Sequence, residues 1–138
     1  MTTIICISDN GGMLFNKRRQ SKDKELVKNL VSFVEENDGV LFISEYSEPL
    51  FATAEGSVIS VSNPLESASR GDFAFVESEG ISRYAEKIKT LVLYKWNRDY
   101  PADVFLDLDP QAAGMTLTEA LDFEGSSHER ITREIWQR

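Results

Sequence analysis

The sequence predicts a three-layer α/β protein built on a mostly parallel, mixed sheet. Short apolar runs rich in β-branched residues, such as IICIS at residues 4–8, alternate with segments of helical periodicity. That alternation is typical of parallel strands joined by right-handed crossovers. The chain has 138 residues, of which 41% are hydrophobic and 28% charged, a size and composition common for one domain with one core. We therefore expect residues 1–138 to form a single domain.

The first third of the chain predicts a strand, a turn, a long helix and a second strand. Residues 3–7 are continuously apolar, as expected for a strand covered on both faces. Two glycines, Gly11 and Gly12, permit the positive φ angles of a turn after it. Apolar residues at helical spacing then predict a helix to about Glu36, capped by Ser21 or Asp23. Residues 40–44, VLFIS, predict the second strand.

The rest of the chain continues this alternation. We expect short helices at 46–52 and 79–87, a loop at 63–71, and strands at 57–62, 73–76, 91–96, 104–108 and 115–123. The last segment, SSHERITREIWQR, fits either a capped helix with Ile131 and Ile135 one turn apart or an edge strand. Periodicity alone does not separate these two alternatives.

The composition argues against several functional classes. With 15 basic and 23 acidic residues, the formal net charge is -8, so the broad basic face of a general nucleic-acid binder is not expected. No apolar run approaches 18 residues and the N-terminus does not resemble a signal peptide, so we expect no membrane span and a cytoplasmic location. Single cysteine and histidine residues argue against a structural zinc site. We expect Cys6 to be a small buried hydrophobe, His128 to be exposed, and no metal to be bound.

A cationic segment on this acidic molecule is the candidate binding site. Five basic residues fall within eight positions: Lys17, Arg18, Arg19, Lys22 and Lys24. Such a cluster attracts anions, and arginine can bind them with two hydrogen bonds. A solvated basic surface is the alternative. The predicted ligand-binding residues are Ser8, Asp9 and Asn10 at the end of the first strand, and Asn16, Arg18, Arg19, Gln20 and Ser21 in the basic segment.

Three stretches of the sequence resemble dihydrofolate reductase-like proteins. The stretch DFAFVESEGISRYAEKIKTLVLYKWNRDYPADVFLDLD (72–109) resembles the family's late strand, glycine turn, Tyr-bearing short helix and following strands. The tail FEGSSHERITREIWQR resembles its closing antiparallel strand. The start, IICISDNGGMLFNKRRQSKDKELVKNL, resembles its first strand, substrate-side loop and first helix. The resemblance implies a dihydrofolate reductase-like fold whose C-terminal segment is an antiparallel strand.

The departures from reductases concern the nicotinamide nucleotide. The place of a Gly-Arg-x-Thr turn reads Ser44-Glu45-Tyr46-Ser47, and that of a Gly-Gly turn reads Ser78-Glu79-Gly80. Few residues remain between Ser62 and Asp72 for the strand and helix that hold the adenosine half. Each carboxylate beside a pyrophosphate is repulsive by about 1 kcal/mol or more. We therefore predict no cofactor, with NADPH as the alternative.

The resemblance also bears on catalysis. Reductases place on the first helix a carboxylate that supports protonation of the substrate; Asp23 or Glu25 stands at that place, although the family's Leu-Pro-Trp lead-in is replaced by Arg18-Arg19-Gln20. Acids that serve the helix dipole are the alternative for both. Our first hypothesis is a protein that binds a small anionic molecule without nicotinamide-dependent catalysis. The alternatives are an NADPH-dependent reductase of a pterin-like substrate, and a protein-interaction or immunity-type module with exposed aromatic residues (Tyr46, Trp96, Tyr100 and Trp136).

The stretch NGGMLFNKRRQSKD also resembles a group of small bacterial proteins, some of which carry a ribonuclease Z label. That activity needs clustered histidines to hold two zinc ions that activate a water molecule. Since His128 is the only histidine in the chain, we do not expect this activity.

Overall fold

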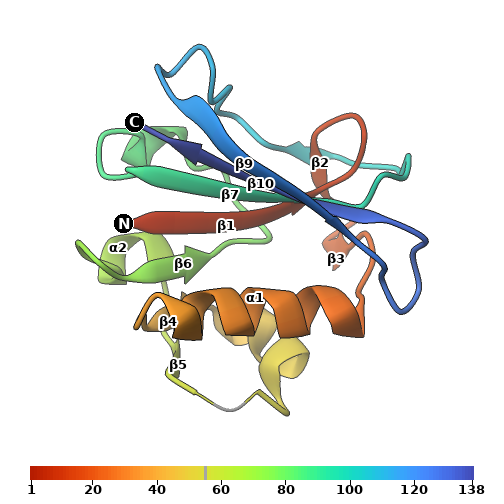
Figure 1. Cartoon of the computed structure of the whole chain (residues 1–138), viewed down its shortest axis with the longest axis horizontal. Helices are drawn as coiled ribbons and strands as arrows, with labels where there is room; N and C mark the ends of the chain where they lie inside the picture. Colours follow the sequence, from red (N-terminus) through yellow and green to blue (C-terminus); the bar gives the residue numbers. More distant parts are fainter. Residues whose placement is uncertain (55) are drawn as a thin grey trace.

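The computed structural model describes residues 1–54 and 56–138 and is organised around a seven-stranded sheet (Figure 1). The strand order is β5-β4-β6-β1-β7-β10-β9. The bounds of these strands are β1 Thr2–Ile7, β4 Leu41–Ile43, β5 Val58–Ser60, β6 Phe73–Phe75, β7 Thr90–Lys95, β9 Thr116–Phe123 and β10 Ile131–Gln137. Strands β5, β4, β6, β1 and β7 are mutually parallel, whereas β10 pairs antiparallel with both β7 and β9. The predicted mixed, mostly parallel sheet is confirmed.

The C-terminal segment is the strand β10 and not a helix. Ile131, Arg133 and Ile135 are buried while the residues between them are partly exposed, which is the two-residue period of a strand. Lying between β7 and β9, β10 has a hydrogen-bonding partner on each side. Those two ladders satisfy the backbone polar groups that a helix would have satisfied internally.

The sheet carries an apolar core on each face. On one face, α1 (Lys24–Glu36) and the 3₁₀ helix η1 (Glu45–Phe51) cover Ile4, Phe75 and Val92. On the other, Ile5 and Leu93 pack with α2 (Pro64–Ser67) and the chain around the 3₁₀ turn η2 (Ser82–Tyr84). Alternate residues of β1 thus enter different cores, which explains why that strand is continuously apolar.

Helix α1 begins at the predicted cap and lies along one face of the sheet (Figure 1). Asp23 is in extended conformation and accepts hydrogen bonds from the N–H groups of Glu25 and Leu26, so it satisfies two of the free donors at the helix start. Leu26, Leu30 and Val34 form the buried stripe. Burial of each stabilises the fold by about 1.5–3 kcal/mol.

Two local predictions between β5 and β7 were wrong. The loop expected at 63–71 contains the helix α2, because Asn63 caps it and Pro64 occupies the first helical position. The helix expected at 79–87 is only the short turn η2. The carboxylate of Asp107, a residue distant in sequence, accepts hydrogen bonds from the N–H groups of Ile81 and Ser82 and holds this segment in a tight turn.

A small second sheet stands beside the carboxyl ends of the central strands. It has the order β3-β2-β8, with β2 at Gly12–Phe15, β3 at Arg18–Arg19 and β8 at Val104–Phe105. No helix in the described part of the chain is long and apolar enough to cross a membrane.

Candidate functional site

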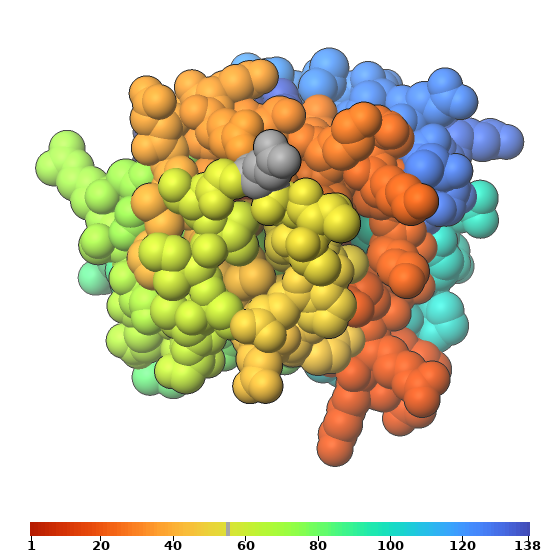
Figure 2. Space-filling model, turned by 90° about the horizontal axis from the view of Figure 1, so that it is seen from below, coloured from red at the N-terminus to blue at the C-terminus, as the bar shows by residue number. Residues whose placement is uncertain are grey.

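The basic segment forms a β-hairpin made of β2 and β3. Its two turn residues, Asn16 and Lys17, have φ angles of 51° and 63°, the left-handed conformation that two-residue hairpin loops of the common primed type require. Asn16 tolerates it because asparagine is enriched in that region. The red to orange-red part of the chain that contains the hairpin projects from one corner of the molecule in Figure 2. Lys17 and Arg18, both exposed, therefore lie on a protruding hairpin, whereas Lys22 and Lys24 follow it in the chain.

An open groove of about 320 Å³ lies against this hairpin. It is lined by Phe15, Asn16, Arg18, Arg19, Gln20, Tyr100 and Pro101. Four of the predicted ligand-binding residues thus share one concave surface, together with the aromatic ring of Phe15, which is 47% exposed. The side chain of Arg18 is exposed to solvent beside it.

The second arginine of the hairpin is held by an acidic partner. Nε and Nη2 of Arg19 donate to the two carboxylate oxygens of Glu77 at 2.9 and 3.0 Å, a two-bond geometry that fixes both groups. Glu77 also accepts a hydrogen bond from Ser47. The Glu77 carboxylate raises the pKa of Arg19 above its usual range, chiefly through its hydrogen bond to the guanidinium. Because Glu77 balances this charge, Arg18 is the better placed of the two arginines to bind an anion.

Behind the groove lies a second, nearly filled cleft between β1, β6 and the start of α1. Arg19 and Gln20 line both spaces, and Cys6 and Ser21 line this inner one. The remaining volume is about 20 Å³, enough for about one water molecule. Gln20 Oε1 is buried with no partner among the described residues, so a water or a ligand donor would satisfy it. Cys6 packs against the core as expected but keeps partial exposure, and burial raises the pKa of its thiol.

The residues predicted at the end of β1 support the hairpin and line neither space. The hydroxyl of Ser8 donates to Asn10 Oδ1 at 2.6 Å and accepts from Gln20 Nε2 at 2.9 Å. Asn10 Oδ1 also accepts from the N–H of Gly12, and Asp9 is exposed. In this structure Ser8 and Asn10 therefore position Gln20.

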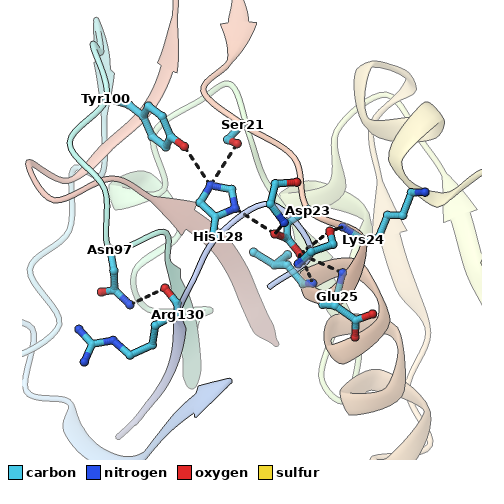
Figure 3. A network of polar contacts seen from close by, with 11 residues as sticks. Ser21, Asp23, Lys24, Glu25, Asn97, Tyr100, His128 and Arg130 are labelled. Atoms are coloured by element: carbon cyan, nitrogen blue, oxygen red, sulfur yellow. Dashed lines mark hydrogen bonds and ion pairs between the residues drawn. The ribbon is translucent and has the colours of Figure 1, made fainter. Parts of the chain in front are cut away.

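The carboxylate of Asp23 is the centre of a buried polar network (Figure 3). Its side chain has no exposed surface. It accepts hydrogen bonds from six donors, which are the N–H groups of Glu25, Leu26, Ser126 and Ser127, the hydroxyl of Ser126, and Nδ1 of His128. Burial by itself would raise the pKa of Asp23, but the hydrogen bonds from His128 and the backbone outweigh it and hold that pKa well below its usual range. Its contacts join the start of α1 to the loop before β10.

The predictions that His128 and Trp96 are exposed were wrong. Both are 4% exposed, because the loop before β10 folds over the end of β7 and stacks the two rings with centroids 4.7 Å apart. Nδ1 of His128 lies 2.9 Å from Asp23 Oδ2. Nε2 lies 2.9 Å from the hydroxyl of Tyr100 and 3.3 Å from that of Ser21. Figure 3 draws both contacts as dashed lines. No sequence signal marks this cluster, since His128 stands 105 positions from Asp23.

The second candidate acid and the two altered turns lie at the surface. Glu25 is exposed and stands 3.8 Å from Lys28 on the same helix. Glu45 opens η1 just after β4, and Glu79 follows β6; both side chains are exposed. Because β4 and β6 are parallel neighbours, the two acids follow the same edge of the sheet. Of the remaining aromatic residues predicted to be exposed, Tyr46 is 38% exposed, whereas Tyr100 and Trp136 are half-buried.

No protein-family model matches this sequence, and no curated protein is similar to it in sequence. Solved structures do match. A dihydrofolate reductase from Enterococcus faecalis, complexed with NADP(H) and RAB-propyl, superimposes with a TM-score of 0.63 at 8% sequence identity, over 99% of this chain and 95% of that one. This likeness shows that the chain has the dihydrofolate reductase-like fold.

Proposed function

We propose that this protein binds a small anionic molecule in the groove beside the β2–β3 hairpin, without nicotinamide-dependent catalysis. The observation that carries the proposal is the groove itself. Its volume of about 320 Å³ is at the lower end of the range for small-molecule sites. It combines a solvent-exposed guanidinium, Arg18, with the amide side chains of Asn16 and Gln20.

The charge distribution favours an anion there. The molecule carries a formal net charge of -8, so most of its surface repels anions, and a local cationic groove gains selectivity from that contrast. The charge of Arg19 is already balanced by Glu77. Arg18 can form two parallel hydrogen bonds with a carboxylate or phosphate.

The aromatic walls favour a ligand that also has an apolar or planar part. Phe15 is 47% exposed although it follows three buried residues of β2, and Tyr100 lines the same groove. A bound ring would cover this apolar surface, at about 25 cal/mol for each Å² removed from water. An aryl phosphate or aryl carboxylate combines the two features.

The inner cleft and the sheet edge support the absence of nicotinamide chemistry. The space between Asp23, Cys6 and Trp96 holds about 20 Å³, far less than a pterin ring needs. Glu45 and Glu79 follow the neighbouring strands β4 and β6, where negative charge would oppose a pyrophosphate. The carboxylate of Asp23 is already occupied by six donors.

Thermal-shift measurements followed by calorimetry test the proposal. The ligands are inorganic phosphate, benzoate, phenyl phosphate, folate and NADPH. We expect phenyl phosphate to stabilise the protein most, by about 2.7 kcal/mol at one hundred times its Kd. Arg18→Glu should abolish that stabilisation. Arg70→Glu changes the same charge at an exposed position outside the groove and should retain it.

Two results would contradict the proposal. If no anion stabilises the wild-type protein, the groove is not an anion site. If NADPH binds tightly, the alternative of a reductase that acts on a pterin-like substrate becomes the better explanation, and hydride transfer should then be sought in the wild type and in Asp23→Asn.

A further inference from the structure

We propose that Ser21 is a nucleophile activated by His128, with Asp23 as the positioning residue, and that the protein can hydrolyse small esters through an acyl-Ser21 intermediate. The three side chains form one chain of contacts, shown in Figure 3. Ser21 Oγ lies 3.3 Å from His128 Nε2, and His128 Nδ1 lies 2.9 Å from Asp23 Oδ2. The order hydroxyl, imidazole and carboxylate is the arrangement that acyl-transfer enzymes use on unrelated folds.

The protonation of the imidazole follows from its partners. An ionised carboxylate only accepts hydrogen bonds, so Nδ1 of His128 carries the proton that faces Asp23. In the neutral ring, Nε2 then presents its lone pair to the hydroxyls of Ser21 and Tyr100. A neutral ring with its proton on Nδ1 is the form that the proposal requires, since its Nε2 can then remove a proton from the Ser21 hydroxyl; the Tyr100 hydroxyl lies at the same nitrogen.

The surroundings of His128 hold the ring in place and keep a carboxylate beside Nδ1. The side chains of His128 and Asp23 are 2% and 0% exposed, and Trp96 stacks on the imidazole. Hydrogen bonds keep Asp23 ionised by holding its pKa low, against the effect of burial. A fixed carboxylate next to the ring stabilises the imidazolium that forms when Nε2 accepts a proton.

Ser21 is partly exposed and adjoins the open groove without lining it. It is half-buried, lines the inner cleft, and follows Gln20, which lines both the cleft and the open groove. Within the described part of the chain, the backbone N–H groups of Ser21 and Lys22 donate to no protein acceptor. No protein acceptor occupies them, and the proposal assigns them to the oxyanion, which needs donors near the nucleophile.

The proposed ester hydrolysis needs no reagent other than the ester and water. Ser21 Oγ forms a bond to the acyl carbon of the ester, its proton moves to His128 Nε2, and the bond to the leaving oxygen breaks as that oxygen takes the proton. Water then attacks the acyl-Ser21 ester, with His128 again accepting and returning a proton, and releases the carboxylic acid. That the ester carries an anionic group in its acyl or alcohol part rests on the function proposed above.

Covalent labelling of the whole protein by phenylmethanesulfonyl fluoride tests the nucleophile. Ser21 Oγ would form a bond to the sulfur of the reagent, and fluoride would leave with the serine proton. Mass spectrometry of the digested protein then locates the labelled residue. We expect one label, on Ser21, and none on Ser21→Ala. Ser32→Ala is the matched control, because Ser32 is an exposed serine of α1. Hydrolysis of p-nitrophenyl acetate should be lost in Ser21→Ala.

The role of His128 is tested by His128→Ala with and without free imidazole. Loss of the general base should lower the labelling rate by about 10²-fold or more, and imidazole that enters the vacated site should restore part of it, which a merely structural role would not show. If His128→Ala does not fold, comparing the labelling of the wild type with that of Ser21→Ala still shows whether Ser21 is the nucleophile. Absence of a label on Ser21, or an unchanged rate in folded His128→Ala, overturns the proposal.

The experiments distinguish failure of the nucleophile proposal from failure of the anion-groove proposal. Phenylmethanesulfonyl fluoride carries no charge, so its reaction does not require the anion groove. Stabilisation of Ser21→Ala by phenyl phosphate, measured as described above, reports on the groove alone.

Discussion

Asp23→Asn perturbs the contact set that joins α1 to the loop before β10. The asparagine Oδ1 can still accept the hydrogen bonds from the helix start, but its amide N–H₂ would face the N–H of Ser127, which now donates to Asp23 Oδ2 at 2.8 Å. A buried donor left without an acceptor costs about 1–3 kcal/mol. Loss of the negative charge weakens the remaining bonds by about another 1 kcal/mol. We therefore expect the free energy of unfolding at pH 7 to fall by about 2–4 kcal/mol.

The same residue predicts a pH dependence with a definite sign. The pKa of Asp23 is lower in the folded protein than in the unfolded chain. Its contribution to stability is therefore fully present above the unfolded value of about 3.9, and is lost as the pH falls below it towards the folded pKa. Asp23→Asn should lose less stability than wild type between about pH 5 and pH 3.

Urea unfolding followed by tryptophan fluorescence measures both effects, since Trp96 stacks on the ring of His128, which is bound to Asp23. Asp99→Asn is the control, because Asp99 is an exposed acid. A loss at pH 7 below about 0.5 kcal/mol, or equal to that of Asp99→Asn, would refute the view that this carboxylate fixes the loop. Stability curves of Asp23→Asn and wild type that run parallel in acid would refute the assigned pKa direction.

Three further substitutions test the packing around the site. Glu77→Gln should lower the free energy of unfolding by about 1–3 kcal/mol, because it leaves the partly buried guanidinium of Arg19 without its charge partner. If the stability difference between wild type and variant disappears at high salt, the pair is instead a screened surface pair. Gly125→Ala should cost about 1–3 kcal/mol, since its Cβ would lie 2.5 Å from Asp23 Oδ2 and force the loop to shift; a wild-type thermal midpoint would contradict this. Leu30→Ala should cost about 2–5 kcal/mol in urea unfolding, because Leu30 is fully buried; a cost below 1 kcal/mol would mean that α1 does not pack on the sheet as described.

Local signals in the sequence were sufficient for most of the secondary structure. The apolar runs of β1, β4 and β7, and the helical stripe of α1, depend on residues only a few positions apart. The cap at Asp23 was recognisable for the same reason. The failures at α2 and η2 arose where a cap or a distant carboxylate decided the local conformation.

The candidate groove was partly accessible to sequence reasoning. The cluster of basic residues, with a glycine turn before it, pointed to Asn16, Arg18 and Gln20, and the structure places these on one surface. What the sequence could not show is that Arg19 is paired with Glu77, 58 positions away, and that Tyr100 lines the groove.

The amino-acid sequence by itself determined the long helix and most strands of the main sheet, the acidic charge of the molecule and the cationic segment, because each follows from neighbouring residues or from composition. Only the tertiary structure decided that His128 is buried beneath Trp96 and joined to Asp23 and Ser21. The physical reason is that burial and hydrogen bonding depend on which distant segments meet. Here β10 inserts between β7 and β9 and brings the loop before it over the start of α1.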